Sequence, residues 1–163
     1  MTTVASLRRE NRSRLLQHLF ADGPLPRYDL AARLGLGPSA VTKVVSELME
    51  FGLVREVGSE ESEEQRRPGR PGILVDLVPS AAHVVGVSHL RGGPLQAALL
   101  DLRGQVVLRR SQPMVVVEPP EGLERIADLV REVAAAAAAL PGGAHGVVGV
   151  GLGVPGRVDD ERG

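Results

Sequence analysis

The sequence contains no cysteine, which excludes disulfide bridges and thiolate metal sites. Aromatic residues make up only 2% of the chain, so any hydrophobic core must be built from Leu, Val, Ile and Ala. No apolar run approaches the ~18–20 residues of a membrane-spanning helix, and the start of the chain lacks the apolar segment of a signal peptide. We therefore expect a cytoplasmic protein that makes no contact with a membrane.

Patterns typical of catalysis and metal binding are also missing. The four histidines, His18, His83, His89 and His145, do not have metal-ligand spacing, and no nucleophile–base pair is recognisable. The stretch from Gly151 to Gly156 fits the dinucleotide pattern G-x-G-x-x-G, but a proline and an acidic loop stand where a helix should begin, which favours close packing in a strand. We predict no catalytic residue, no metal and no cofactor.

Apolar residues make up 43% and charged residues 24% of the 163 positions, which indicates a globular protein of one ordinary domain or two small ones. The net charge of −1 gives the whole chain no bias towards nucleic acid. Any interaction with DNA must therefore be argued from where the charges lie.

The first half of the chain has the pattern of a small α+β domain. Apolar periodicity and turn residues predict three helices and two short strands, at residues 4–20, 27–34, 38–51, 53–57 and 73–77. The first helix is expected to turn one face inward, with Leu7, Asn11, Leu15, Leu19 and Phe20 near it. Pro38 suits the first position of its helix, and Gly52 suits a left-handed cap. The order is typical of a winged helix-turn-helix, within a domain spanning residues 1–78.

The third helix is the strongest functional signal. Val41, Val44, Val45 and Leu48 follow the spacing i, i+3, i+4, i+7 and are predicted to face the core, with Leu30, Leu34 and Leu53 completing it. Ser39, Thr42 and Lys43 then lie on the outer side near the helix start, where a recognition helix meets base edges and phosphates. Arg27, at the start of the second helix, is predicted to contact a phosphate. The alternative is a three-helix module that is structural or binds protein.

The segment EESEEQRRPGRPG (60–72) joins the two predicted strands. Its acidic half, 60–64, would repel phosphates, whereas its basic half carries Arg66, Arg67 and Arg70 among prolines that keep the chain extended. An extended segment with a central arginine suits a narrow minor groove. We predict DNA contact by these three arginines; the alternative is a solvated charge run.

The second half, residues 79–163, has an α/β pattern. Strands are predicted at 83–88, 95–100, 105–109 and 146–154, and a helix at 119–140. A turn is expected at 101–104, and the last strand is expected to be buried. The helix is expected to present one apolar stripe made of Leu123, Ile126, Ala127, Val130, Val133 and Ala137. Such a small sheet with one helix is the beginning of a domain rather than a complete one.

The segments RENRSRLLQHL, LPRYDLAARLGLGPSAVTKVVSELMEFGLVREVG and GRPGILVDL resemble the N-terminal domain of ROK-family transcriptional regulators. HVVGVSHLRGGPLQAALLDLRGQVV and VGVGLGVPGRVDD resemble the opening of the ROK domain. The resemblance implies a winged helix-turn-helix followed by an incomplete α/β actin-like ATPase (ribonuclease H-like) subdomain. It also implies a double-stranded DNA operator, a homo-oligomer that is usually dimeric or tetrameric, and repression or activation of carbohydrate genes. A sugar or sugar-phosphate effector is implied if the domain were complete.

One departure from the family bears on enzymatic activity. ROK kinases carry a phosphate loop Asp-x-Gly-x-Thr, and this sequence has Ser88-His-Leu-Arg-Gly-Gly93 in its place. We therefore expect a regulator rather than an enzyme, and a truncated one. Two alternatives stay open: a fragment of a ROK-type sugar kinase or sugar-binding protein, and a module without DNA contact that dimerises with a full-length relative.

Overall fold

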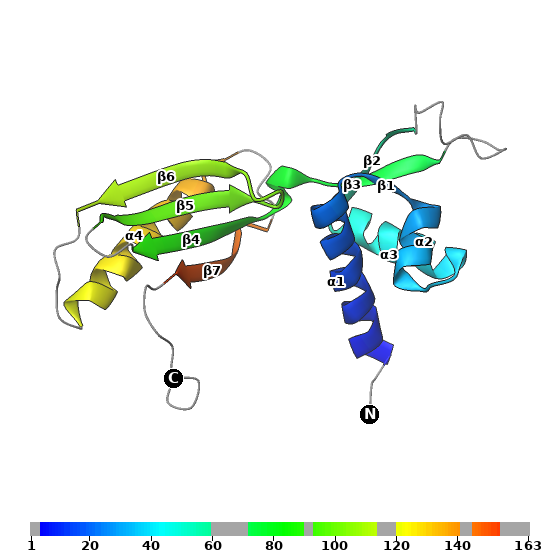
Figure 1. Cartoon of the computed structure of the whole chain (residues 1–163), viewed down its shortest axis with the longest axis horizontal. Coiled ribbons are helices and arrows are strands. Elements are labelled where there is room, and N and C mark those ends of the chain that lie inside the picture. The colour runs from blue at the N-terminus through cyan, green and yellow to red at the C-terminus, as the bar shows by residue number, and fades with distance from the viewer. Residues whose placement is uncertain (1–3, 60–71, 90–92, 114–119, 141–144, 154–163) are drawn as a thin grey trace. The chain divides into compact units, whose positions relative to one another are not determined.

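The computed structural model describes residues 4–59, 72–89, 93–113, 120–140 and 145–153. The chain divides into two compact units, Met1–Pro79 and Ser80–Gly163, whose elements are labelled in Figure 1. Among the described residues, no helix is both long and apolar enough to span a membrane.

The first unit contains three helices and a small antiparallel sheet. Its elements are α1 (Val4–Asp22), β1 (Leu25–Pro26), α2 (Arg27–Leu34), α3 (Pro38–Glu50), β2 (Val54–Ser59) and β3 (Ile73–Leu77). The strand order is β1-β3-β2, with Leu25 opposite Val75 and Val54 opposite Leu77. The predicted bounds of α2 and β3 are confirmed, and α3 ends one residue earlier than predicted. The two-residue strand β1 had no counterpart among the predicted elements.

Glycines with positive φ close the helices of the first unit. Gly23 (φ 86°) follows α1, and its N–H donates to the Leu19 carbonyl at 3.2 Å, so α1 runs two residues further than predicted. Gly52 has a φ of 69°, which confirms the left-handed cap after α3. Its N–H donates to the Met49 carbonyl at 2.9 Å.

The core of the first unit lies between its helices and its sheet. It contains the buried residues Leu15, Leu19, Leu25, Leu30, Leu34, Val41, Val44, Val45, Leu48, Val54, Val75 and Leu77.

The predicted inner face of α1 is partly wrong: Leu7 and Phe20 are 47% and 57% exposed. Leu7 lies on the N-terminal half of α1, which extends past α2 and α3 (Figure 1). Phe20 follows the buried Leu19 directly, so the ~100° rotation per residue turns it away from the core. Leu53 is only half-buried.

In the second unit, the described residues form a four-stranded sheet with one helix packed on it. After the short 3₁₀ turn η2 (Pro79–Ala81), its elements are β4 (His83–His89), β5 (Leu95–Asp101), β6 (Val106–Gln112), α4 (Glu121–Ala137) and β7 (Val147–Gly153). The strand order is β6-β5-β4-β7, and β4 pairs with β7 in parallel while the other pairs are antiparallel. The expected hairpin turn is confirmed, since Gly104 donates to the Asp101 carbonyl at 2.9 Å with a φ of 73°.

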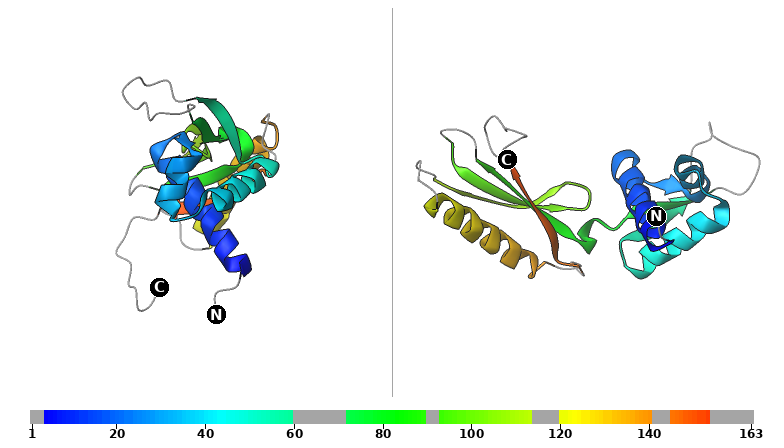
Figure 2. Two further views of the ribbon diagram at one scale, coloured as in Figure 1. Left: turned by 90° about the vertical axis from the view of Figure 1, so that its right-hand side faces the viewer. Right: turned by 90° about the horizontal axis from the view of Figure 1, so that it is seen from below.

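The core of the second unit lies between α4 and one face of the sheet (Figure 2, right). It contains Val85, Val87, Leu95, Ala97, Leu99, Leu129, Val133 and Ala137. The predicted stripe of α4 is partly wrong, because Leu123 is 62% exposed and Leu129 is buried in its place. Leu123 stands one position beyond the buried Gly122, and therefore about 100° round the helix from the face that packs.

The predicted burial of the last strand is wrong for the residues that the structure describes. Val148, Val150 and Leu152 are 59%, 56% and 46% exposed. Val150 pairs with Val85 and Leu152 with Val87, so both lie on the same face of the sheet as α4. However, α4 packs mainly over β5 and β4. The edge strand β7 therefore has an apolar face that α4 does not cover.

Candidate nucleic-acid interface

Helix α3 separates an apolar inner face from a polar outer one. Val41, Val44, Val45 and Leu48 are between 0% and 7% exposed, which confirms the predicted core face. Ser39, Thr42 and Lys43 are all exposed. The structure therefore brings these three predicted residues together on one outward surface at the start of the helix.

The start of α3 is fixed by its backbone. Gly37 has extended dihedrals (φ −69°, ψ 155°) as N-cap, and Pro38 is the first helical residue. The carbonyl of Gly37 accepts from the N–H groups of Ala40 and Val41 at 3.0 and 3.1 Å. Since these bonds form the first turn of the helix, they hold Ser39 in a defined orientation close to Thr42.

The hydroxyl of Thr42 is already used as a donor. Its Oγ1 donates to the Pro38 carbonyl at 2.9 Å, one turn earlier in the helix. A hydroxyl has a single proton, so the outward lone pairs of Oγ1 can accept but the group cannot donate in this arrangement. In a major groove it would match the amino groups of adenine or cytosine, and its methyl group would match the methyl group of thymine.

The turn between α2 and α3 depends on one left-handed glycine. Gly35 caps α2 with φ 65° and ψ 32°. The next N–H, that of Leu36, donates to the Ala31 carbonyl at 3.1 Å. The chain thus reverses within three residues, which is the compact turn expected of a helix-turn-helix.

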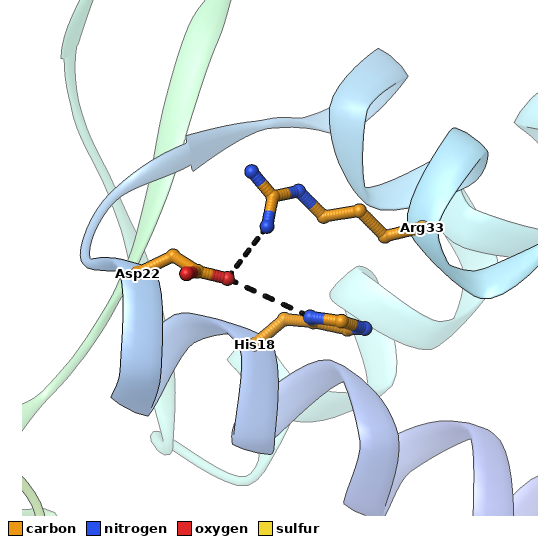
Figure 3. Close-up of polar contacts among 3 residues, drawn as sticks. All are labelled: His18, Asp22 and Arg33. Carbon is orange, nitrogen blue, oxygen red and sulfur yellow. Dashed lines mark hydrogen bonds and ion pairs between the residues drawn. The ribbon is translucent and has the colours of Figure 1, made fainter.

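A shared carboxylate fixes the end of α1 against α2 (Figure 3). Asp22 Oδ2 accepts from Arg33 Nη1 at 2.6 Å and lies 3.6 Å from His18 Nδ1. The side chains of Asp22 and Arg33 are 38% and 39% exposed, so solvent screens the pair. The pair joins the end of α1 to α2, the helix that precedes the turn.

Arg27 has a partner within the domain. Its Nη1 lies 2.8 Å from Glu56 Oε1 on β2, and the two side chains are 30% and 40% exposed. Its Nε is buried and makes no hydrogen bond. The structure therefore places Arg27 at the start of α2, as expected, but holds its guanidinium group against the wing strand.

Arg12 was not among the predicted interface residues. Its Nε lies 3.1 Å from Glu47 Oε2 without a hydrogen bond, and its guanidinium carbon lies 5.6 Å from the centre of the Phe51 ring. Arg12 therefore connects α1 with the C-terminal end of α3 and neutralises one of the acids there. Residues 35 positions apart give no local sequence signal, so only the tertiary structure identifies this contact.

The wing is described only at its base. Arg66, Arg67 and Arg70 lie outside the described residues, as does most of the charged segment that contains them. At the base, β2 and β3 are paired with a register shift between Val57 and Ser59, where Gly58 has a φ of 55°. A bulge of this kind increases the local twist of the pair.

The second unit provides no cation site among the residues that the structure describes. No group of three or more His, Cys, Asp or Glu side chains there could hold a metal. His83 and His89 each have a buried Nδ1 without a hydrogen-bond partner. Residues 90–92, which belong to the segment Ser88–Gly93, lie outside the described residues.

Comparison with known proteins agrees with this geometry. Residues 8–55 match the family model described as winged helix-turn-helix DNA-binding. The xylose repressor of Bacillus subtilis (strain 168) is 26% identical over 156 residues, which cover 96% of this chain and 38% of the repressor. The DNA-binding transcriptional repressor Mlc of Escherichia coli (strain K12) is 33% identical over 104 residues, which cover 64% of this chain and 25% of Mlc.

A solved structure shares the fold. The crystal structure of a ROK family transcriptional regulator, a homologue of the E. coli Mlc protein, matches with a TM-score of 0.65 and 23% identity. The match covers 96% of this chain and 38% of that one, so the chain spans less than two fifths of the length of these relatives. Residues 8–55 thus match a winged helix-turn-helix DNA-binding family, and the chain is similar in sequence to proteins named as transcriptional repressors and in fold to a ROK family transcriptional regulator.

Proposed function

We propose that this chain is a DNA-binding transcriptional regulator that represses carbohydrate-related genes by occupying a double-stranded operator. The observation that supports this most directly is the outer face of α3. Ser39, Thr42 and Lys43 are exposed together, and four buried apolar residues on the opposite face hold the helix in place. This surface lies within the segment that matches the winged helix-turn-helix family.

Residues 1–78 form the DNA-binding domain in this proposal. Ser39, Thr42 and Lys43 enter the major groove, and Arg66, Arg67 and Arg70 contact the minor groove or its phosphates from the wing. Arg27 contacts a phosphate after leaving Glu56, or it stabilises the base of the wing without touching DNA. The first role requires that the ion pair with Glu56 opens on binding.

Residues 79–163 form the N-terminal portion of a ROK domain with an actin-like ATPase (ribonuclease H-like) fold. Two relatives that the chain matches, the B. subtilis xylose repressor and E. coli Mlc, are named as repressors, which favours regulation over catalysis. The sequence Ser88 to Gly93 lacks the acid and the threonine of the kinase loop. A sugar or sugar phosphate is the effector class expected of a complete ROK domain, and homo-oligomers are expected.

Selection of DNA duplexes from a random library by the purified chain tests the proposal. We expect one enriched sequence, with protection from cleavage over the enriched bases. The triple variant Ser39→Ala/Thr42→Ala/Lys43→Ala should select nothing, while its circular dichroism spectrum stays unchanged because all three side chains are exposed. A wild-type chain that enriches no sequence at low salt would overturn the proposal.

An experiment in which the chain is mixed with a full-length relative distinguishes direct operator binding from a role as an interaction module. If the chain protects DNA only when a full-length relative is added, its role is to dimerise with that relative. Protection by the chain alone supports direct operator binding.

A further inference from the structure

We propose that α1 carries a second DNA contact: an arginine stripe, Arg8, Arg9 and Arg12, whose exposed members Arg8 and Arg9 bind the phosphate backbone flanking the site read by α3. The inference rests on the proposed DNA-binding function and extends it to a helix that the helix-turn-helix pattern does not assign to DNA. It is carried by the charge, the shape and the position of this stripe.

The N-terminal half of α1 is strongly basic although the whole chain is not. Residues 4–14 contain four arginines, at positions 8, 9, 12 and 14, and one acid, Glu10. Arg8 and Arg9 are exposed, and neither takes part in an ion pair among the described residues. The chain's net charge is −1, so this concentration of positive charge is local and is available to an external anion.

The stripe also has a surface shape that suits a phosphate group. Among the described residues, Ala5, Arg8, Arg9 and Arg12 line a surface hollow of about 290 Å³. Their spacing is i, i+3, i+4 and i+7, which places all four on one face of the helix. Ala5 adds little bulk, so the guanidinium groups border an open space. A guanidinium group can bind phosphate oxygens through paired N–H donors.

The position of the stripe connects it with the recognition surface. Arg12 pairs with Glu47 and lies over the Phe51 ring, so the stripe begins where α3 ends. The free end of α1 continues beyond α3 (Figure 1). A duplex whose major groove holds the start of α3 has its phosphate backbone on the flank where α3 leaves the groove. Because duplex DNA carries one charge per ~1.7 Å, a basic stripe there meets several phosphates.

An acidic protein segment is the competing occupant. Residues 60–64 of a second copy would offer four carboxylates. We favour DNA because the stripe is continuous with α3 through Arg12, whereas nothing places an acidic segment of another chain beside it. The two occupants predict different results in the same experiment.

The test uses the duplex selected by the wild-type chain, in two lengths. The short duplex covers only the bases enriched by selection, and the long duplex adds about one helical turn, ~10 base pairs, on each side. Fluorescence anisotropy titrations over a range of salt concentrations compare the wild type with Arg8→Ala/Arg9→Ala. The charge-preserving control is Arg8→Lys/Arg9→Lys. The matched control is Arg109→Ala/Arg131→Ala, which removes two exposed arginines from the second unit.

We expect Arg8→Ala/Arg9→Ala to bind the long duplex at least about tenfold more weakly. The salt slope, which is the steepness with which the logarithm of the binding constant falls with the logarithm of the salt concentration, should decrease by about 1.8, because two phosphate contacts contribute ~0.9 each. Its affinity for the short duplex should change less than about twofold. The lysine variant should keep most of the slope, since lysine preserves the charge, and the matched control should behave as the wild type.

Three results would overturn the proposal. Unchanged binding of the long duplex by Arg8→Ala/Arg9→Ala excludes the contact. If the variant binds both duplexes equally more weakly, the arginine stripe does not contact DNA outside the site that α3 reads. Loss of self-association in sedimentation, with DNA affinity unchanged, assigns the stripe to a second copy. Failure of the proposed function itself is distinguished by the wild type, which would then bind neither duplex.

Discussion

Arg27 on α2 and Glu56 on β2 form an ion pair in which Arg27 Nη1 lies 2.8 Å from Glu56 Oε1. This pair joins the first turn of the second helix to the base of the wing. Both side chains are about one third exposed, so their mutual attraction is reduced by solvent. The same guanidinium group that could bind a phosphate is thus held by an acid of its own domain.

The ion pair can be measured by a double-mutant cycle with Arg27→Ala, Glu56→Ala and the double variant. We expect a coupling of about 0.2–1 kcal/mol in the free energy of unfolding, as for other half-exposed pairs. Glu56→Gln should raise DNA affinity if Arg27 contacts a phosphate, because the guanidinium group is then released. Unchanged affinity in both Glu56→Gln and Arg27→Ala would restrict Arg27 to stabilising the wing.

Lys43 is exposed at the start of α3, and its role depends on what it meets. If it meets a phosphate, Lys43→Ala should lower affinity for all duplexes alike and reduce the salt slope by about 0.9. If it reads a base, discrimination between the selected duplex and a single-base variant should fall, by about 1–3 kcal/mol. Lys43→Arg is the control that keeps the charge. Unchanged affinity and unchanged discrimination would remove Lys43 from the interface.

Arg70 belongs to the wing segment that is predicted to meet DNA. Arg70→Ala should weaken binding to the selected duplex by about 1–3 kcal/mol, since a central arginine in an extended segment suits a narrow minor groove. Arg55→Ala is a matched control, because Arg55 is exposed on β2 and lies opposite Asp76. Equal affinities of wild type and Arg70→Ala in a gel-shift titration would refute the wing contact.

A glycine is required at position 52 because of the backbone conformation there, and not because neighbouring atoms leave no space for a side chain. Its φ is 69°, and an added Cβ would meet no atom within 4 Å. Gly52→Ala should therefore destabilise the first unit by about 1–2 kcal/mol through conformational strain alone. Gly37 also has open space around it, but its φ is −69°. We expect Gly37→Ala to change stability by no more than about 0.5 kcal/mol, as measured by urea unfolding.

Helix α3 could be predicted from the sequence because several independent sequence patterns indicate the same helix. The four-position spacing from Val41 to Leu48, the proline at the first turn and Gly52 beyond the end all specify the same helix. Its inner and outer faces follow directly from that spacing, so the exposure of Lys43 was predictable as well. Contacts between segments that are distant in the sequence could not be predicted. The pairing of Arg12 with Glu47, and of Arg27 with Glu56, depends on how the helices and strands pack.

The errors in the predicted faces have a common physical origin. Hydrophobicity identifies residues that favour burial, but burial also requires a neighbour. Leu7, Leu123 and Val150 are apolar and exposed because no described element packs over them. The alanines at residues 134–137 of α4 add no contrast between its faces, so the predicted stripe was rotated by about one position. The edge position of β7 became evident only from the sheet order.

The middle strand of the wing sheet, β3, is held on both sides: by β1, where Leu25 is opposite Val75, and by β2, where Val54 is opposite Leu77. The N–H of Val78 also donates to the Leu53 carbonyl at 2.9 Å. None of these contacts depends on the number of residues that connect β2 with β3. Each doubling of a flexible connection costs only about 0.6 kcal/mol of closure entropy. A change in the number of connecting residues should therefore leave the sheet and the helices of the first unit folded, so this connection can vary in length during evolution without loss of the fold.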